Sequence, residues 1–129
     1  MSTLLTLGYA IIENFSPPSE LALMRARLDE LTREYHESVV FRTDTLQEEA
    51  QAKSDYFLKS AERIHFFYEP SGPLNKVGHG LHFDPVFGAY AHSRKVADLL
   101  PFEDPRLVQS MYIFKSAHHG GAVTSHQDA

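Results

Sequence analysis

The chain has 129 residues, the size of one domain, with an ordinary hydrophobic share of 43% and a net charge of −5. Acidic and basic residues are interspersed and no apolar run approaches roughly 18 residues, so nucleic-acid binding and a membrane span are not expected. The N-terminus lacks the features of a secretory signal, and the absence of cysteine excludes disulfides and thiolate metal sites, so we expect an intracellular, cytoplasmic protein.

The N-terminal part of the sequence predicts a strand followed by a helix. Residues 8–15 are mostly apolar and predict a short strand, which the sequence Ser16-Pro17-Pro18 ends. The apolar residues that follow recur at steps of three and four, as on an amphipathic helix: Leu21, Met24, Leu28, Leu31 and Tyr35. Burial of this stripe against the chain's own sheet is favoured over docking of a partner.

The middle of the chain predicts a polar, partly helical segment and then a strand. Residues 43–59 are polar, and Thr45 and Glu48 have the spacing of a capping box. Residues 63–69 are rich in aromatic side chains, which is typical of a strand. The Pro- and Gly-containing residues 70–73 should end that strand in a turn.

The C-terminal part predicts a second helix and a second clear strand. Residues 85–100 form an amphipathic pattern, with Asp84 as the expected N-cap and Pro85 at the first helical position. Residues 107–115 predict a strand with alternating faces. One face carries Leu107, Gln109, Met111 and Ile113, and the other carries Val108, Ser110, Tyr112 and Phe114.

The last four residues contain the most informative motif. His126 and Asp128 lie two apart, so on an extended strand both side chains point to the same side. An imidazole and a carboxylate are two of the three protein ligands in a 2-His-1-carboxylate iron site. A second His-x-Asp triplet ends at Asp84, but that Asp is interpreted as a helix cap. The predicted metal ligands are therefore His126 and Asp128.

Several ordered blocks of the sequence together resemble the phytanoyl-CoA dioxygenase family. No single block is specific, but their combination is, and it covers residues 8–129. The blocks are residues 55–58, 64–67, 75–82, 84–87 and 109–115, the turn Gly120-Gly121 and the motif His126-Gln127-Asp128.

The resemblance implies a fold and an activity. The fold would be α+β, with helices packed on a double-stranded β-helix (jelly roll) that is incomplete here. The activity would be hydroxylation by a dioxygenase that uses Fe(II), 2-oxoglutarate and O₂, with ascorbate as a supporting reductant. Under this resemblance His126 and Asp128 would be the catalytic iron ligands. Lys76 and Met111 would contact 2-oxoglutarate, since an ammonium suits a dicarboxylate and Met is soft and adaptable.

The other histidines have simpler interpretations. His118 and His119 are adjacent, so their side chains should face opposite ways and could not easily reach one ion. His65 is interpreted as a satisfied or half-exposed strand histidine rather than a catalytic base. His79 and His82 are candidates for the border of the cosubstrate pocket.

The resemblance also implies later strands, with a second His ligand and an Arg that binds the far carboxylate of 2-oxoglutarate. We therefore expect residues 1–129 to form a single partial domain, truncated just after the His-x-Asp motif and inactive alone. One alternative is a non-catalytic fragment that acts as a binding or regulatory module through unpaired strand edges. Another is a small His-containing metal-binding module. The sequence predicts neither the primary substrate nor the oligomeric state.

Overall fold

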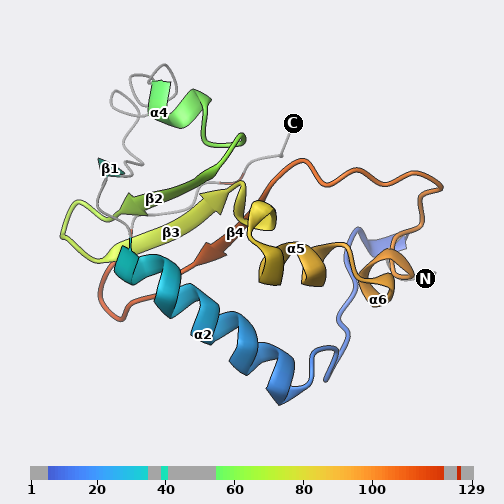
Figure 1. Ribbon diagram of the computed structural model, residues 1–129. Helices are drawn as coiled ribbons and strands as arrows, with labels where there is room; N and C mark the ends of the chain where they lie inside the picture. The colour runs from blue at the N-terminus through green and yellow to red at the C-terminus, as the bar shows by residue number, and fades with distance from the viewer. Residues whose placement is uncertain (1–5, 35–38, 41–54, 121–124, 126–129) are drawn as a thin grey trace. The chain divides into compact units, whose positions relative to one another are not determined.

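The computed structural model of the protein describes residues 6–34, 39–40, 55–120 and 125. The chain divides into two compact units, which we name the helical unit (Met1–Tyr35 and Asp84–Leu107) and the sheet unit (His36–Phe83 and Val108–Ala129). None of the helices within the described residues is long and apolar enough to cross a bilayer. The elements in chain order are α2 (Pro18–Glu34), β1 (Val39–Val40), α4 (Asp55–Leu58), β2 (Ile64–Tyr68), β3 (Leu74–His79), the 3-10 helix η1 (Leu81–Phe83), α5 (Pro85–Ala91), α6 (Arg94–Ala97) and β4 (Ser110–Ile113) (Figure 1).

Helix α2 confirms the predicted amphipathic helix. It begins at Pro18, where a proline costs no helical hydrogen bond because the first N–H groups of a helix have no intrahelical acceptor. Leu28 at the centre of the stripe is fully buried, Met24 and Leu31 are half-buried, and Leu21 is exposed. The helix packs against α5 within the helical unit.

Asp84 caps α5, as predicted. Its Oδ1 accepts hydrogen bonds from the backbone N–H groups of Val86 (3.0 Å) and Phe87 (3.4 Å), and Pro85 follows at the first helical position. The other carboxylate oxygen accepts a 2.7 Å hydrogen bond from Arg27 Nε of α2. The buried Asp84 therefore both starts α5 and ties it to α2.

The predicted single helix over residues 85–100 is wrong, because the structure has two short helices there. Helix α5 ends with His92 as its C-cap, and Ser93 is extended with ψ of 147°, so the ladder of helical hydrogen bonds is interrupted before α6 begins. Neither residue is a glycine or proline, so the sequence carries no strong signal for this break.

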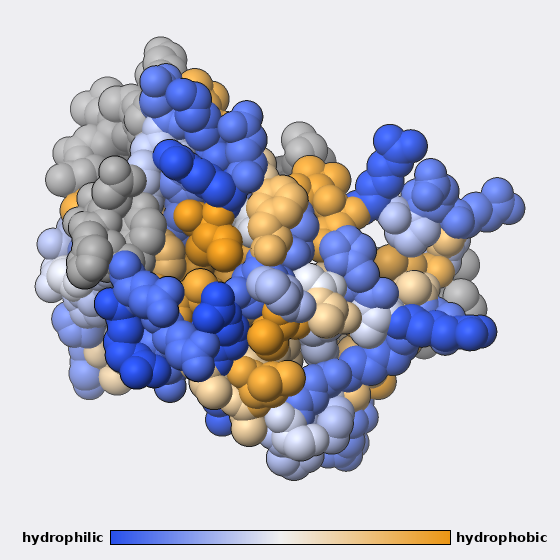
Figure 2. Space-filling view, viewed as in Figure 1, coloured by the Kyte–Doolittle hydropathy of each residue, from blue (hydrophilic) through white to orange (hydrophobic). Residues whose placement is uncertain are grey.

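The predicted strand over residues 8–15 is also wrong. This segment is irregular, and it exposes apolar side chains, of which Ile11 is 83% accessible. A strand needs a neighbour that shares its hydrogen bonds, and the sheet formed by the described residues contains β1 to β4 alone. Apolar surface is also visible in the space-filling view, where orange marks hydrophobic residues (Figure 2).

Lys95 at the start of α6 is enclosed by two aromatic rings. Its ammonium lies 4.7 Å from the ring centroid of Phe15 and 4.9 Å from that of Tyr90, which is a cation–π arrangement. It also donates a hydrogen bond to Glu20 of α2, and this bond lowers the pKa of that carboxyl group. These contacts fasten the irregular N-terminal segment to the helices of its unit.

The described residues of the sheet unit form four strands in the order β1-β2-β3-β4, with β1 parallel to β2 and the other neighbours antiparallel. Strand β2 confirms the strand predicted over residues 63–69. Strand β4 confirms only the central part of the strand predicted over residues 107–115. The helices and the mostly antiparallel sheet agree with the predicted α+β class. Among the residues of this unit that the structure describes, the buried hydrophobic ones are Phe66, Phe67, Val77 and Leu81.

Gly78 allows β3 and β4 to approach closely. A Cβ atom placed on Gly78 would lie 2.5 Å from the Cβ of Met111 and 2.8 Å from the carbonyl oxygen of Ser110. Because real Cβ contacts are longer than 3.0 Å, only glycine fits at this position. The glycine therefore sets the position of Met111 across the ladder.

Candidate active site

Lys76 is a buried cation on β3. The residue is only 9% accessible, and its Nζ lies 5.2 Å from the centre of the Phe67 ring on β2, the residue opposite it in the ladder. Burial lowers the pKa of Lys76 from 10.5 to about 8, because the charged form loses hydration. An ammonium in such a place favours an anionic ligand.

Met111 lies on the same face of the sheet as Lys76. Opposite residues of an antiparallel pair share a face, and side chains alternate along each strand. Met111 lies opposite Gly78, and Ile113 lies opposite Lys76. Lys76 and Gly78 are two residues apart on β3, so Lys76 and Met111 belong to the same face. The structure therefore brings together, on one face, the two residues that were predicted to contact 2-oxoglutarate.

His79 joins Lys76 around the Phe67 ring. Its imidazole centre lies 5.5 Å from that of Phe67, and its Nδ1 lies 2.6 Å from the hydroxyl of Ser60. Burial, followed by the charge of Lys76 and then His65, lowers the pKa of His79 from 6.5 to about 4. The sequence placed His79 only as a candidate for the pocket border, and it gave no sign that Ser60, 19 residues earlier, would hold the ring.

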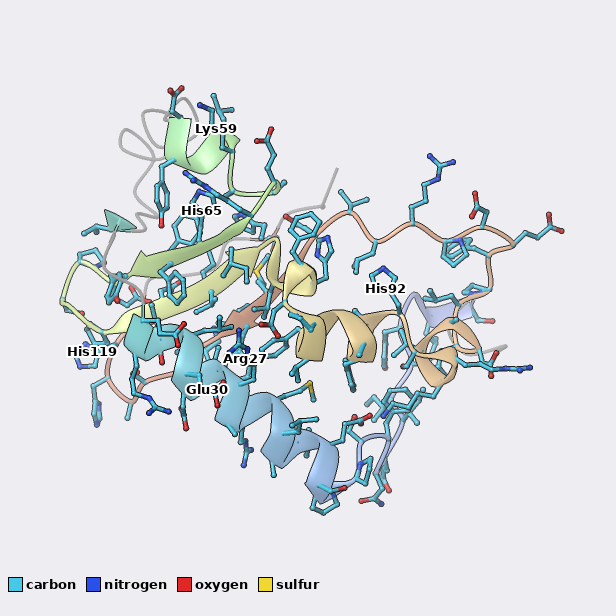
Figure 3. All side chains as sticks on the ribbon, in the orientation of Figure 1. Arg27, Glu30, Lys59, His65, His92 and His119 are labelled. Carbon is cyan, nitrogen blue, oxygen red and sulfur yellow. The ribbon has the colours of Figure 1, made fainter. Side chains whose placement is uncertain are left out.

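His65 is a satisfied strand histidine, the first of the two predicted alternatives, and it is not half-exposed. It is fully buried, its Nδ1 lies 3.2 Å from the carbonyl oxygen of Arg63, and its Nε2 accepts a 3.4 Å hydrogen bond from Arg63 Nε. The Tyr56 ring from α4 meets it edge-on at 4.3 Å, on the side of β2 that faces the α4 segment (Figure 3). These contacts hold the His65 ring in a fixed orientation on β2.

His82 connects η1 to the start of β4. Its backbone N–H donates a 2.7 Å hydrogen bond to the Ser110 hydroxyl, and its ring Nδ1 lies 2.9 Å from the same oxygen. Because Ser110 precedes Met111, this double contact fixes the strand next to the candidate site. His82 is thus linked to the strand that carries Met111.

The loop after β4 is held by the β2–β3 hairpin. The Ser71 hydroxyl lies 2.9 Å from Nδ1 of His119, which is labelled in Figure 3. Next to this contact Glu69 accepts a 2.5 Å hydrogen bond from the side-chain amide of Asn75, and Gly120 turns the chain with φ of 121°. The predicted iron ligands His126 and Asp128 lie beyond this turn, outside the described residues.

The lowered pKa of the buried His79 imidazole predicts that the protein loses stability in acid. The pKa of His79 is about 4 in the folded protein against 6.5 when exposed, so the unfolded chain binds more protons between these values. The free energy of unfolding should therefore fall by roughly 2–3 kcal/mol as pH falls from 6.5 to 4. Urea melts at several pH values measure this slope. His79→Gln should flatten the slope, and an unchanged slope in that variant would contradict the assignment.

Comparison with known proteins identifies the family. The family described as Phytanoyl-CoA dioxygenase (PhyH) matches residues 6–129. Phytanoyl-CoA dioxygenase domain-containing protein 1 of Bos taurus is 40% identical over 144 aligned residues, which cover 95% of this chain and 50% of that protein. Phytanoyl-CoA dioxygenase 1 of Oryza sativa subsp. japonica is 38% identical, with 94% and 48% coverage. The chain spans about half the length of these curated relatives. Because the family match extends over nearly the whole sequence, the chain belongs to the phytanoyl-CoA dioxygenase (PhyH) family.

Proposed function

We propose that the chain is part of the catalytic domain of a dioxygenase that depends on Fe(II) and 2-oxoglutarate and is built on a jelly roll. The observation that carries this proposal is the buried ammonium of Lys76 on the same sheet face as Met111. A relative in rice and one in Arabidopsis thaliana are named phytanoyl-CoA dioxygenases, which supports an oxygenase. The name does not fix the substrate of this chain, because function lies in the site.

Lys76 would bind one carboxylate of 2-oxoglutarate. In a site shielded from water, the attraction between an ammonium and a carboxylate is much stronger than in bulk solvent. The bound carboxylate would raise the pKa of Lys76 from about 8 back toward its ordinary value, so binding above pH 8 should take up a proton. Met111 would supply an apolar wall that excludes water from the same ligand.

His126 and Asp128 would hold the metal. An imidazole nitrogen and a carboxylate oxygen are ligands that non-haem Fe(II) accepts, so the donor set fits this ion. When bound, iron and 2-oxoglutarate supply the oxidising chemistry with O₂. The described residues would orient the cosubstrate and exclude water from it.

Replacing Lys76 tests the cosubstrate role. In the full-length gene product, Lys76→Ala should raise the KM for 2-oxoglutarate at least about tenfold, because the cation that pairs with the carboxylate is gone. Affinity for Fe(II) should stay the same. The assay is succinate formation over a series of 2-oxoglutarate concentrations. Lys59→Ala is the matched control, since that ammonium is exposed beside α4. An unchanged KM in Lys76→Ala would contradict the assignment.

Replacing His126 tests the metal role. Succinate formation by the full-length gene product should require Fe(II) and should disappear in His126→Ala and Asp128→Ala, because each variant removes a metal ligand. His92→Gln is a suitable control, as its exposed ring is bound to the carbonyl of Gly88 at the end of α5. The 129-residue chain is assayed alongside. Iron-independent turnover, or full turnover by His126→Ala, would overturn the proposed function.

A further inference from the structure

We propose that the β2–β3 hairpin positions the chain that leads into the predicted metal motif, with Ser71 as the positioning residue. Ser71 lies at the tip of the hairpin, 55 residues before His126 in the sequence. The sequence indicated only a turn at residues 70–73 and gave Ser71 no role. The metal named here rests on the proposed function.

The tip of the hairpin is closed by hydrogen bonds around Glu69. The backbone N–H of Glu69 donates to the carbonyl of Pro73 (2.8 Å), and the Glu69 carbonyl accepts from the N–H of Gly72 (2.9 Å). The Glu69 carboxylate, on a residue that is only 8% accessible, accepts a 2.5 Å hydrogen bond from the side-chain amide of Asn75. Ser71 therefore lies on a stretch of backbone that is fixed on both sides.

Two hydrogen bonds join this hairpin to the segment after β4. The N–H of Phe114, which directly follows β4, donates to the carbonyl of Asn75 (2.8 Å). Further along the chain, the Ser71 hydroxyl lies 2.9 Å from Nδ1 of His119 (Figure 3). The segment is therefore anchored at Phe114 and again at His119, five residues later.

The turn at the second anchor has a defined form. The N–H of His119 donates a 3.2 Å hydrogen bond to the carbonyl of Ser116. Gly120 follows with φ of 121°, and a Cβ atom there would lie 3.7 Å from Oε1 of Glu69, so the turn lies against the hairpin. With Ser71, these contacts fix the backbone at the point from which the chain continues to the metal motif.

An anchor close to a metal ligand reduces the entropy that the ligand loses when it binds the ion. His126 is seven residues after His119 and twelve after Phe114. Expressed as an equilibrium constant, the penalty for closing a chain segment grows with about the 3/2 power of its length, so loss of the His119 anchor should weaken metal binding roughly twofold. The chain also loses its fixed exit from the turn, and we expect about two- to threefold in total.

Metal titration of the full-length protein tests this role. The metal-free protein is titrated with Co(II) in place of Fe(II), because the visible absorption of Co(II) follows its ligation. Ser71→Ala should raise the Kd for Co(II) about two- to threefold. Ser71→Thr keeps a hydroxyl and should bind as the wild type does. Ser116→Ala is the matched control, because this serine contributes to the same turn through its backbone carbonyl, which alanine retains.

A double-mutant cycle shows whether the contact itself is responsible. Ser71→Ala, His119→Ala and the variant with both changes should show the same increase in Kd, because each removes the same hydrogen bond. Both side chains are exposed, so the urea midpoint of the metal-free protein should match that of the wild type in all three variants. A lowered midpoint that accompanies the loss of affinity would show a merely structural role and would overturn the positioning role.

The remaining outcomes separate this role from the proposed function. An unchanged Kd in Ser71→Ala, or additive losses in the cycle, would overturn the positioning role even though the wild type binds Co(II). If the wild type did not bind Co(II), or if His126→Ala bound it equally well, the proposed function would fail and the positioning role with it.

Discussion

Replacing Gly78 with Ala should separate β3 from β4 and destabilise the sheet unit. The added methyl group would lie 2.5 Å from the Cβ of Met111 and 3.0 Å from its Cα, and backbone atoms cannot rotate away as a flexible side chain can. We expect the free energy of unfolding to fall by about 3 kcal/mol, at the upper end of the usual cost of overpacking. Urea denaturation followed by circular dichroism measures this loss.

Gly78→Ala should also weaken binding of the proposed cosubstrate, 2-oxoglutarate. Because Met111 lies directly across from Gly78, a shift of β4 away from β3 increases the distance between the Met111 side chain and Lys76. Gly72→Ala is the control, as its Cβ would meet nothing within 4 Å and only its φ of 111° is unfavourable for alanine. We expect that control to cost about 1 kcal/mol and to leave cosubstrate affinity intact. Equal losses in the two variants would show that the close approach of the strands is unimportant.

Replacing Asp84 with Ala should loosen the helical unit. The change removes the acceptor for two backbone N–H groups at the start of α5, and loss of an N-cap alone costs about 1–2 kcal/mol. It also removes the partner of Arg27, whose other carboxylate contact is Glu30 one turn further along α2 (Figure 3). Hydrogen exchange of the α5 amides, together with the urea midpoint, would report both losses.

A conservative variant separates the two roles of Asp84. Asn is as good an N-cap as Asp, so Asp84→Asn should keep α5 intact while it removes the ion pair with Arg27. Its loss of stability should be clearly smaller than that of Asp84→Ala. If the two variants lost equal stability, the cap would contribute nothing and the charge would account for the whole effect.

Local signals explain the elements that the sequence predicted well. The stripe of α2, the aromatic run of β2 and the Asp84-Pro85 cap each depend on residues within one or two turns of each other. Strand β3 was not predicted, because Asn75, Lys76 and Gly78 are poor strand formers by themselves. That strand is held by neighbours on both sides, and such pairing is invisible to a local pattern.

The residues of the candidate site also fall into two groups: those indicated by the local sequence, and those placed by contacts between distant segments. The motif at His126 and the block around Lys76 are each continuous in sequence, so the residue spacing and the resemblance indicated them without any knowledge of the fold. The contacts of His79 with Ser60 and with the Phe67 ring join three separate segments, so they emerge only once the sheet is formed. The predicted strand over residues 8–15 failed for the converse reason, since its apolar pattern is present but no described strand lies beside it.

The enclosure of Lys95 has a consequence for limited proteolysis. A protease such as trypsin must draw its target residue into an extended conformation, and Lys95 is held in a helix by Phe15, Tyr90 and Glu20. Arg106, in contrast, lies in an irregular segment with 86% of its side chain accessible. Trypsin should therefore cut after Arg106 before it cuts after Lys95, which becomes accessible only when the helical unit opens, so the order of these two cuts would report that opening.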